Sequence, residues 1–136
     1  LFTRIITGEI PGRFVWRDEL AVAFLTKDPL KPGHTLVVPI AEVDHWLDAE
    51  PALLAHLTQV AQTVGSALQR AFSPRKVGMM IAGLEVPHLH IHLVPIDRVH
   101  DLDFANAQHD TPAAALDEAA QRIRTALREL GHPAAE

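Results

Sequence analysis

The chain has 136 residues, 48% of them hydrophobic and 21% charged, and a net charge of −5, which is typical of a single globular domain. The acidic balance and the lack of a basic stretch argue against a nucleic-acid partner, and no apolar run reaches the ~18 residues of a membrane span. Cysteine is absent, which excludes disulfides, cysteine-ligated zinc and cysteine nucleophiles.

Hydrophobic periodicity predicts three helices and five strands. In chain order, we expect a helix over 1–7, strands over 13–17, 20–26 and 34–39, a long helix over 49–72, strands over 77–82 and 88–95, and a last helix that stops at Gly131. Asp48 and Thr111 are the expected N-caps of the long and last helices, and 97–110 is expected to be a polar loop. Because alternating βα units are absent, these elements predict an α+β fold: a mainly antiparallel five-stranded sheet with one long helix packed on it and an additional C-terminal helix.

Three histidines, His88, His90 and His92, alternate with apolar residues in the last predicted strand. Successive side chains of a strand point to opposite faces, so the imidazoles share one face and the intervening leucines and isoleucine share the other. We expect the apolar face to pack on the long helix and the histidine face to be partly open.

Three imidazoles on one face are suited to two kinds of chemistry. A neutral imidazole is a competent nucleophile toward phosphorus, and a neighbouring imidazole can donate to a phosphate oxygen or a leaving group. Histidine is also the commonest transition-metal ligand, so the pattern alone leaves a metal site open.

The histidine segment also carries a resemblance to a known family. It fits the pattern His-φ-His-φ-His-φ-φ, with φ apolar, over residues 88–94, and further matches in the same order occur over 4–11, 23–25 and 32–39. This series resembles the histidine triad (HIT) superfamily, in particular its Hint-like branch of nucleoside-phosphate hydrolases. The resemblance implies a HIT-like fold, with the HIT domain over 1–100 and a loop and helix extension of the same domain over 101–136.

The resemblance implies a two-step reaction at the α-phosphate of an AMP-like phosphoramidate or anhydride. His90 matches the nucleophile that forms a covalent nucleotidyl-histidine, from which water releases the nucleoside monophosphate. His92 matches the residue on the phosphate and leaving-group side, His88 a supporting member, and His34 a fourth histidine from a neighbouring strand. The family uses no metal or other cofactor for this chemistry.

Apolar residues near the N-terminus match positions that line the nucleobase site of the family. They are Leu1, Phe2, Ile5 and Phe24. For Ile5 and Phe24, simple core packing is an equal alternative.

The chain departs from the family pattern at several positions. Thr26 stands where relatives often carry an aspartate that holds the ribose, and a hydroxyl cannot act as an anionic acceptor for two groups. The short loop before the triad carries Glu85, which is either a general acid or amine-binding group, or an exposed loop carboxylate. A structural zinc site of some relatives needs cysteines that this chain lacks. The segment 97–104 either folds over the active-site face or links to the last helix, and four further histidines are expected at the surface: His45, His56, His109 and His132.

These features predict a nucleotide hydrolase, with a small-molecule nucleotide as substrate and neither nucleic acid nor membrane as partner. Three alternatives stay open: a nucleotide-binding regulatory module with little turnover, a metal-binding protein that uses the histidine face, and a nucleotidyltransferase that uses an acceptor other than water. The resemblance also implies a homodimer formed through the long helix and a sheet edge. We expect a cytoplasmic location, because the N-terminal sequence lacks a signal-peptide layout.

Overall fold

A five-stranded antiparallel sheet forms the centre of the computed structural model, which describes residues 1–132. The strands are β1 (Phe14–Arg17), β2 (Ala21–Leu25), β3 (Thr35–Pro39), β4 (Lys76–Met80) and β5 (Ile91–Ile96). They lie in the order β1-β2-β3-β5-β4, and each neighbouring pair is antiparallel. The predicted α+β class and five-stranded sheet are confirmed, and β5 lies between β3 and the edge strand β4.

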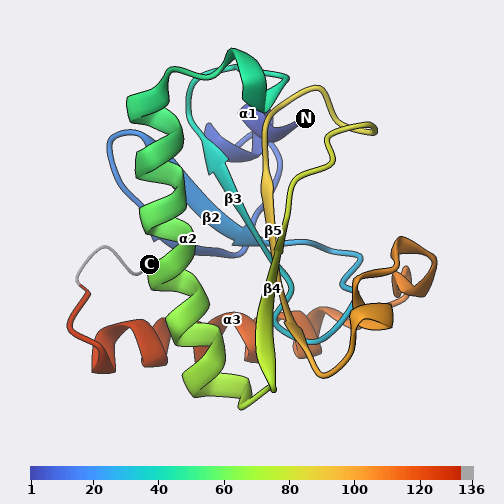
Figure 1. Cartoon of the computed structure of the whole chain (residues 1–136). Coiled ribbons are helices and arrows are strands. Elements are labelled where there is room, and N and C mark those ends of the chain that lie inside the picture. The colour runs from blue at the N-terminus through green and yellow to red at the C-terminus, as the bar shows by residue number, and fades with distance from the viewer. Residues whose placement is uncertain (133–136) are drawn as a thin grey trace.

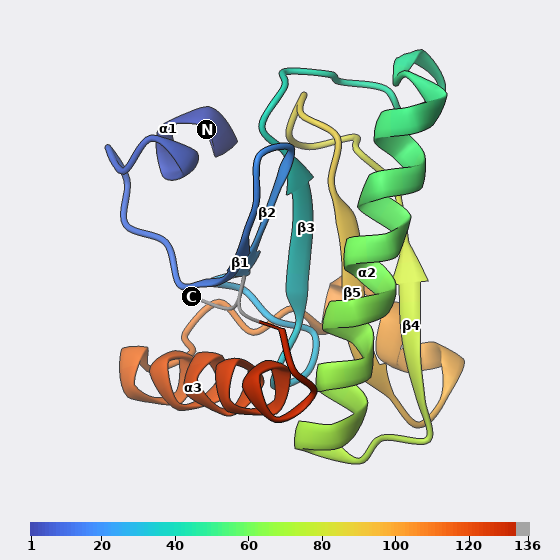
Figure 2. The same cartoon turned by 90° about the vertical axis from the view of Figure 1, so that its left-hand side faces the viewer.

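The helices cover the sheet from different sides. They are α1 (Phe2–Ile6), α2 (Pro51–Phe72) and α3 (Ala113–Glu129), together with short 3-10 turns η1 (Trp46–Asp48), η2 (Val99–Leu102) and η3 (Phe104–Asn106). The long helix α2 runs along one face, whereas α1 lies on the opposite side of the sheet (Figures 1 and 2). Helix α3 packs on α2 and on β1. Within residues 1–132, no helix combines the length and apolar character needed to cross a membrane.

Strands β2 and β3 are buried on both faces, which explains their nearly continuous apolar sequences. Their alternate side chains divide between two apolar clusters. The larger cluster joins the sheet to α2 and α3 and includes Leu89, Ile91 and Leu93, as predicted for the apolar side of the histidine segment. The smaller cluster lies on the other face, where Phe2 of α1 packs with Phe24. The sheet is thus covered on both faces, and the histidine segment lies within it.

The long helix begins at Pro51, with Glu50 at its N-cap, so the predicted cap at Asp48 was wrong. Residues 46–48 instead form the 3-10 turn η1, in which the Leu47 N–H donates to His45 Nδ1 over 3.3 Å. Proline fits the first helical position because its missing N–H would have no partner there. Local side-chain capping therefore starts the separate turn η1, and proline sets the start of α2.

The last helix also begins later than predicted, at Ala113. Its N-cap is Pro112, because the Thr111 hydroxyl donates to the Gln108 carbonyl over 3.1 Å and does not cap the helix. The expected polar loop over 97–110 contains η2 and η3. The buried Asp101 carboxylate organises the first of these turns by accepting the N–H groups of Asp97 and Arg98.

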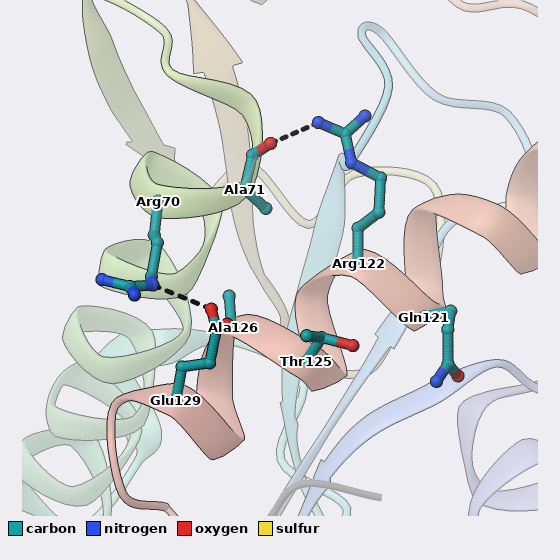
Figure 3. A pocket seen from close by; sticks show the side chains of 7 residues that line it. All are labelled: Arg70, Ala71, Gln121, Arg122, Thr125, Ala126 and Glu129. Carbon is teal, nitrogen blue, oxygen red and sulfur yellow. Dashed lines mark hydrogen bonds and ion pairs between the residues drawn. The ribbon is translucent and has the colours of Figure 1, made fainter.

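Two arginines connect α3 to the C-terminal end of α2 (Figure 3). Arg70 pairs with Glu129 over 3.0 Å, and Arg122 donates to the Ala71 carbonyl while its guanidinium lies 4.4 Å from the Phe72 ring centroid. A lysine could not both stack in this way and donate from a planar fork. These contacts fix the end of α2, whose Phe72 ring lies against Gly33 in the turn before β3. The division of the chain into a domain over 1–100 and an extension over 101–136 stays a prediction.

The turn before β3 generates a stability prediction. Gly33 has φ +94°, and a Cβ there would lie 2.7 Å from the Phe72 ring, whereas Gly83 has φ +75° and open space around it. Both Gly→Ala changes force alanine into a left-handed conformation, at a cost of about 1 kcal/mol. Gly33→Ala should cost about 1–3 kcal/mol more than Gly83→Ala because of the collision. Urea unfolding of the two variants measures this difference, and equal losses would contradict it.

Candidate functional site

The histidine segment differs from the prediction in where regular pairing begins. Strand β5 starts at Ile91, which pairs with Val37 of β3, so it does not extend back to His88. Before that point the backbone bonds to loops: the His88 N–H donates to Val86 and the Leu89 N–H donates to Val43. The segment nevertheless keeps its alternation, because Leu89 lies in the apolar core while the histidines lie on the other face.

All four predicted histidines lie together and are buried. Their exposed fractions are 3% for His34, 5% for His88, 6% for His90 and 8% for His92. His34 directly precedes β3, and its ring centroid lies 5.2 Å from that of His92. The His90 and His92 centroids lie 4.8 Å apart. The four side chains are thus more buried than expected, although His90 lines a cavity of about 240 Å³ together with Asp44 and Leu84.

Two phenylalanines account for much of this burial. The Phe2 ring from α1 lies edge-on to His90 at 5.0 Å and to His88 at 5.7 Å. The Phe104 ring from η3 lies edge-on to His92 at 5.1 Å. The two chain segments that supply these rings are almost 100 residues apart in sequence, and they flank the histidine pair from opposite ends.

A chain of hydrogen bonds fixes the tautomers of His34 and His92. The Leu30 N–H donates to His34 Nδ1 over 3.0 Å, so the ring proton of neutral His34 is on Nε2. That nitrogen lies 2.9 Å from His92 Nδ1 and donates to it. Neutral His92 then carries its own proton on Nε2. His92 is thereby prepared as a hydrogen-bond donor.

The other two histidines are held by backbone carbonyls, which can only accept. His90 Nδ1 lies 2.7 Å from the His88 carbonyl oxygen and donates to it, so the Nε2 lone pair of neutral His90 is free of a proton. His88 Nε2 donates to the Pro39 carbonyl over 2.8 Å. The neighbouring His90 and His92 rings therefore present an unprotonated Nε2 on His90 and an N–H donor on His92, while His88 keeps an unprotonated Nδ1.

Burial keeps three of these rings neutral, those of His34, His90 and His92. It lowers the pKa of His34 to about 3, with the nearby His92 and His90 as further causes. Burial lowers the pKa of His92 to about 4, again with His90 as a second cause. It also lowers the pKa of His90, against the opposing effects of the His88 carbonyl and the Glu85 carboxylate. An unprotonated His90 Nε2 is consistent with nucleophilic chemistry near neutral pH.

The donor set is poorly suited to a metal ion. Among residues 1–132, no group of three or more histidine, aspartate or glutamate side chains is placed to hold one. The only unprotonated nitrogens of His34 and His92 are the Nδ1 atoms, and each already accepts a hydrogen bond. A metal ligand needs a free lone pair, which among the four histidines is found on His90 Nε2 and His88 Nδ1, so a third histidine ligand would require this network to rearrange.

The residues predicted for the base site separate into two groups. Phe2 and Phe24 are buried in one apolar cluster, with ring centroids 5.6 Å apart, and Ile5 packs against that cluster. Leu1, by contrast, is 62% exposed and occupies the N-cap position of α1. Three of the four apolar positions therefore meet beside His90.

Thr26 and Glu85 occupy different edges of the site. The Thr26 hydroxyl accepts the Asp28 N–H over 3.2 Å, and Thr26 lines a cavity of about 160 Å³ together with His34 and Gln108. Glu85 is exposed on the loop before the triad but near enough to affect the His90 pKa.

The structure places Phe104 at the site, which the sequence pattern did not single out, and it shows that His56 is less exposed than expected. Phe104 was expected only as part of a segment that either covers the site or links to α3, and nothing in its local sequence marks the contact with His92. His56 is half-buried, because its Nε2 lies 2.8 Å from the Asp18 carboxylate at the β1–β2 turn. His45 and His109 are exposed, as predicted, and His132 is half-buried with its ring 5.9 Å from that of Trp16.

Comparison with known proteins agrees with this geometry. The family model described as HIT domain matches residues 7–99. The crystal structure of a hypothetical histidine triad nucleotide-binding protein from Sulfolobus tokodaii superposes with a TM-score of 0.84 at 28% identity, covering 95% of this chain and 92% of that one.

Two relatives are named for their activities. A bis(5'-nucleosyl)-tetraphosphatase from Schizosaccharomyces pombe is 33% identical over 91 residues, or 63% of this chain and 50% of that protein. An adenylylsulfatase from Arabidopsis thaliana is 23% identical over 133 residues, or 94% of this chain and 67% of that protein.

The neutral histidines predict a pH dependence of stability. In the unfolded chain they titrate near the ordinary value of 6.5, whereas in the fold His34 titrates at about 3 and His92 at about 4. Below pH 6.5 the unfolded chain therefore binds protons that the folded chain does not. The free energy of unfolding should fall as the pH drops from 6.5 toward 4, with a limiting slope of about 1.4 kcal/mol per pH unit for each such histidine.

A variant isolates the contribution of one ring. Urea unfolding of the parent protein and of His34→Gln between about pH 7 and pH 4.5 should show a shallower decline in the variant, because one proton fewer is taken up on unfolding. Equal slopes for the two proteins would show that His34 is not held neutral by the fold.

Proposed function

The chain belongs to the HIT family, and from that premise we propose that it hydrolyses nucleoside phosphate derivatives at the α-phosphate through a covalent nucleotidyl-histidine. The observation that carries the proposal is that two neighbouring rings differ in protonation: His90 has an unprotonated Nε2, and His92 has an N–H donor. The names of the two relatives, a tetraphosphatase and an adenylylsulfatase, support a nucleotide anhydride as the substrate class.

In the first step, the His90 Nε2 lone pair attacks the α-phosphorus. A P–N bond to His90 forms while the bond from phosphorus to the leaving group breaks. The His88 carbonyl keeps accepting the hydrogen bond from the Nδ1–H of His90 and so stabilises the positive charge that develops on the ring. A departing phosphate or sulfate leaves as an anion and takes no proton, whereas an amine takes one from solvent.

In the second step, water attacks the phosphorus and the P–Nε2 bond breaks. The water proton is lost to solvent, the nucleoside monophosphate is released, and His90 regains its lone pair. Throughout, the N–H of His92 donates to a phosphate oxygen or to the leaving atom. His34 acts through His92 as a positioning residue, because its hydrogen bond sets the His92 tautomer.

The nucleoside is proposed to bind on the α1 side of His90. The apolar cluster of Phe2, Ile5 and Phe24 supports this placement, because a nucleobase needs apolar and aromatic surface. Phe2 now lies against His88 and His90, so a bound nucleoside requires its ring to move or to serve as one wall of the site.

We also propose that the protein forms a homodimer through α2 and β4. Strand β4 is an edge of the sheet, with unpaired backbone groups on its outer side. A groove of about 620 Å³ lies between α2 and β4, lined by residues that include Gln62, Ser66 and Met79. The Met79 side chain is 56% exposed there, which is consistent with burial by a second copy.

The central test is turnover of adenosine 5'-phosphosulfate, a dinucleoside polyphosphate and an adenosine 5'-phosphoramidate by metal-stripped protein. The parent should release AMP from at least one, and His90→Asn should lower the rate by about 10³-fold or more. His56→Asn is the matched control, because His56 contacts Asp18 away from the triad, and it should stay within about twofold of the parent.

Mass spectrometry after a basic quench should detect a nucleotidyl adduct on the parent but not on His90→Asn. Incorporation of ¹⁸O from labelled water into AMP distinguishes hydrolysis from transfer to another acceptor. Absence of turnover on all three substrates would refute the proposal, and nucleotide binding without turnover would favour a regulatory module.

Thr26 makes ribose recognition a separate prediction. Its single hydroxyl already accepts a backbone N–H, so the protein should bind AMP less than about fivefold more tightly than 2'-deoxy-AMP. Thr26→Asp supplies a charged acceptor and should increase that preference by about tenfold. Calorimetric titration of both ligands measures the ratio. A strong ribose preference in the parent would show that other groups hold the hydroxyls.

A further inference from the structure

His90 combines a free ring nitrogen with a place in the wall of a cavity. The residue is only 6% exposed, and its Nδ1 donates to the His88 carbonyl, whereas within residues 1–132 no group hydrogen-bonds to its Nε2. The cavity that His90 lines has a volume of about 240 Å³. A free lone pair on a buried ring beside open space is an arrangement suited to receiving a ligand.

Apart from Leu89 and His90, the lining of this cavity comes from two loops, residues 44–46 and 81–84. The Leu89 N–H donates to the Val43 carbonyl over 2.6 Å, which ties the first loop to the residue next to His90. The Asp48 N–H donates to the His45 carbonyl over 2.9 Å and closes the turn η1. Asp44 lies between these two carbonyls, so backbone hydrogen bonds on both sides hold it at the cavity.

The charged groups around this cavity are negative. Asp44 supplies a carboxylate to the lining, and no lysine or arginine lines the cavity in the part of the chain that the structure describes. Glu85 directly follows Leu84 of the lining, and its carboxylate acts on His90 by opposing the fall in the pKa of that ring. A ligand in the cavity therefore meets negative charge.

The neighbouring segments supply no compensating cation. The sequence has no lysine or arginine over 32–69 or over 77–97. Arg4, the basic residue of α1, is paired with Glu9 over 3.6 Å. A polyphosphate leaving group would lack the arginines and lysines that usually bind phosphate, whereas an ammonium group would be attracted.

The remaining lining suits an aliphatic chain. Leu84 is 95% exposed and Trp46 is 42% exposed, so both side chains have apolar surface that a ligand can cover. The face of an indole ring also attracts a cation. Substitution at phosphorus occurs in line, so a leaving group points away from the attacking His90 and toward these loops.

We propose that the cavity between the 44–46 and 81–84 loops selects leaving groups by charge and accepts an alkyl chain that ends in an ammonium group. The chain lies along Leu84 and Trp46, and the ammonium pairs with the Asp44 carboxylate. Asp44 is a specificity-determining residue in this scheme and takes no part in bond breaking. The inference rests on the proposed function for the position of the phosphorus.

The test compares adenosine 5'-phosphoramidates of three amines that differ at the far end of the chain. Cadaverine ends in an ammonium, hexylamine in a methyl group and ε-aminocaproate in a carboxylate. Affinities are measured by calorimetry in a His90→Asn background, where no covalent intermediate forms. The cadaverine ligand should bind about tenfold more tightly than the ε-aminocaproate ligand at low ionic strength, with the hexylamine ligand between them. Asp44→Asn should reduce that ratio to about threefold or less, whereas Asp44→Glu should retain it.

Asp48→Asn is the matched control, because it removes the same charge from η1 at a residue that does not line the cavity. It should leave the ratio within about twofold of its starting value. A merely structural role of Asp44 would weaken all three ligands equally. The proposal is overturned if the background protein does not distinguish the ligands, if Asp44→Asn keeps the ratio, or if Asp48→Asn lowers it as much as Asp44→Asn does.

Turnover by the protein with His90 intact separates this inference from the proposed function. A charge preference in binding that depends on Asp44, without hydrolysis of any ligand, would support the selective cavity and refute the hydrolase function. Hydrolysis with the same kcat/KM for all three ligands would support the function and refute the selective cavity.

Discussion

The hydrogen bond from His34 Nε2 to His92 Nδ1 determines what the site can do. Its direction is set by the Leu30 N–H, which donates to the other nitrogen of His34 and so leaves the ring proton on Nε2. A neutral imidazole has one donor and one acceptor, so one backbone N–H fixes the proton positions of two rings in succession. The His88 carbonyl fixes His90 in the same way but with the opposite result, because it requires Nδ1 to donate. Two chemically identical side chains thus acquire different roles from their backbone partners.

The histidines that form this arrangement are shielded from water by side chains from distant parts of the chain. Phe2 and Phe104 contact opposite ends of the His90–His92 pair, and the sheet with α2 lies behind it. The same burial keeps the rings neutral, since desolvation disfavours the imidazolium form. His90 nevertheless lines a cavity of about 240 Å³ together with Asp44 and Leu84, so the covering rings leave one side of it accessible.

The elements that local sequence predicted best are those in which one physical effect dominates. The five strands and α2 follow from apolar periodicity, and the alternation at 88–95 correctly separated Leu89 and Ile91 from the histidines. Errors occurred where several local groups compete. Asp48 is a good N-cap by type, but η1 and Pro51 move the helix start beyond it. Thr111 likewise bonds back to Gln108 and leaves the helix end to Pro112.

The sequence by itself determined the family, the fold class and the four histidines that meet. Alternation and motif spacing depend only on residue order, which is why they could be read directly. Tertiary structure alone decided the proton positions, because these depend on the Leu30 N–H and on the Pro39 and His88 carbonyls. Such groups belong to the backbone, so no residue type in the sequence marks them. Tertiary structure also decided that the four histidines are buried and that Phe104 lies against His92. Contacts between residues so far apart in the chain arise from the packing of the sheet, and no local pattern encodes them.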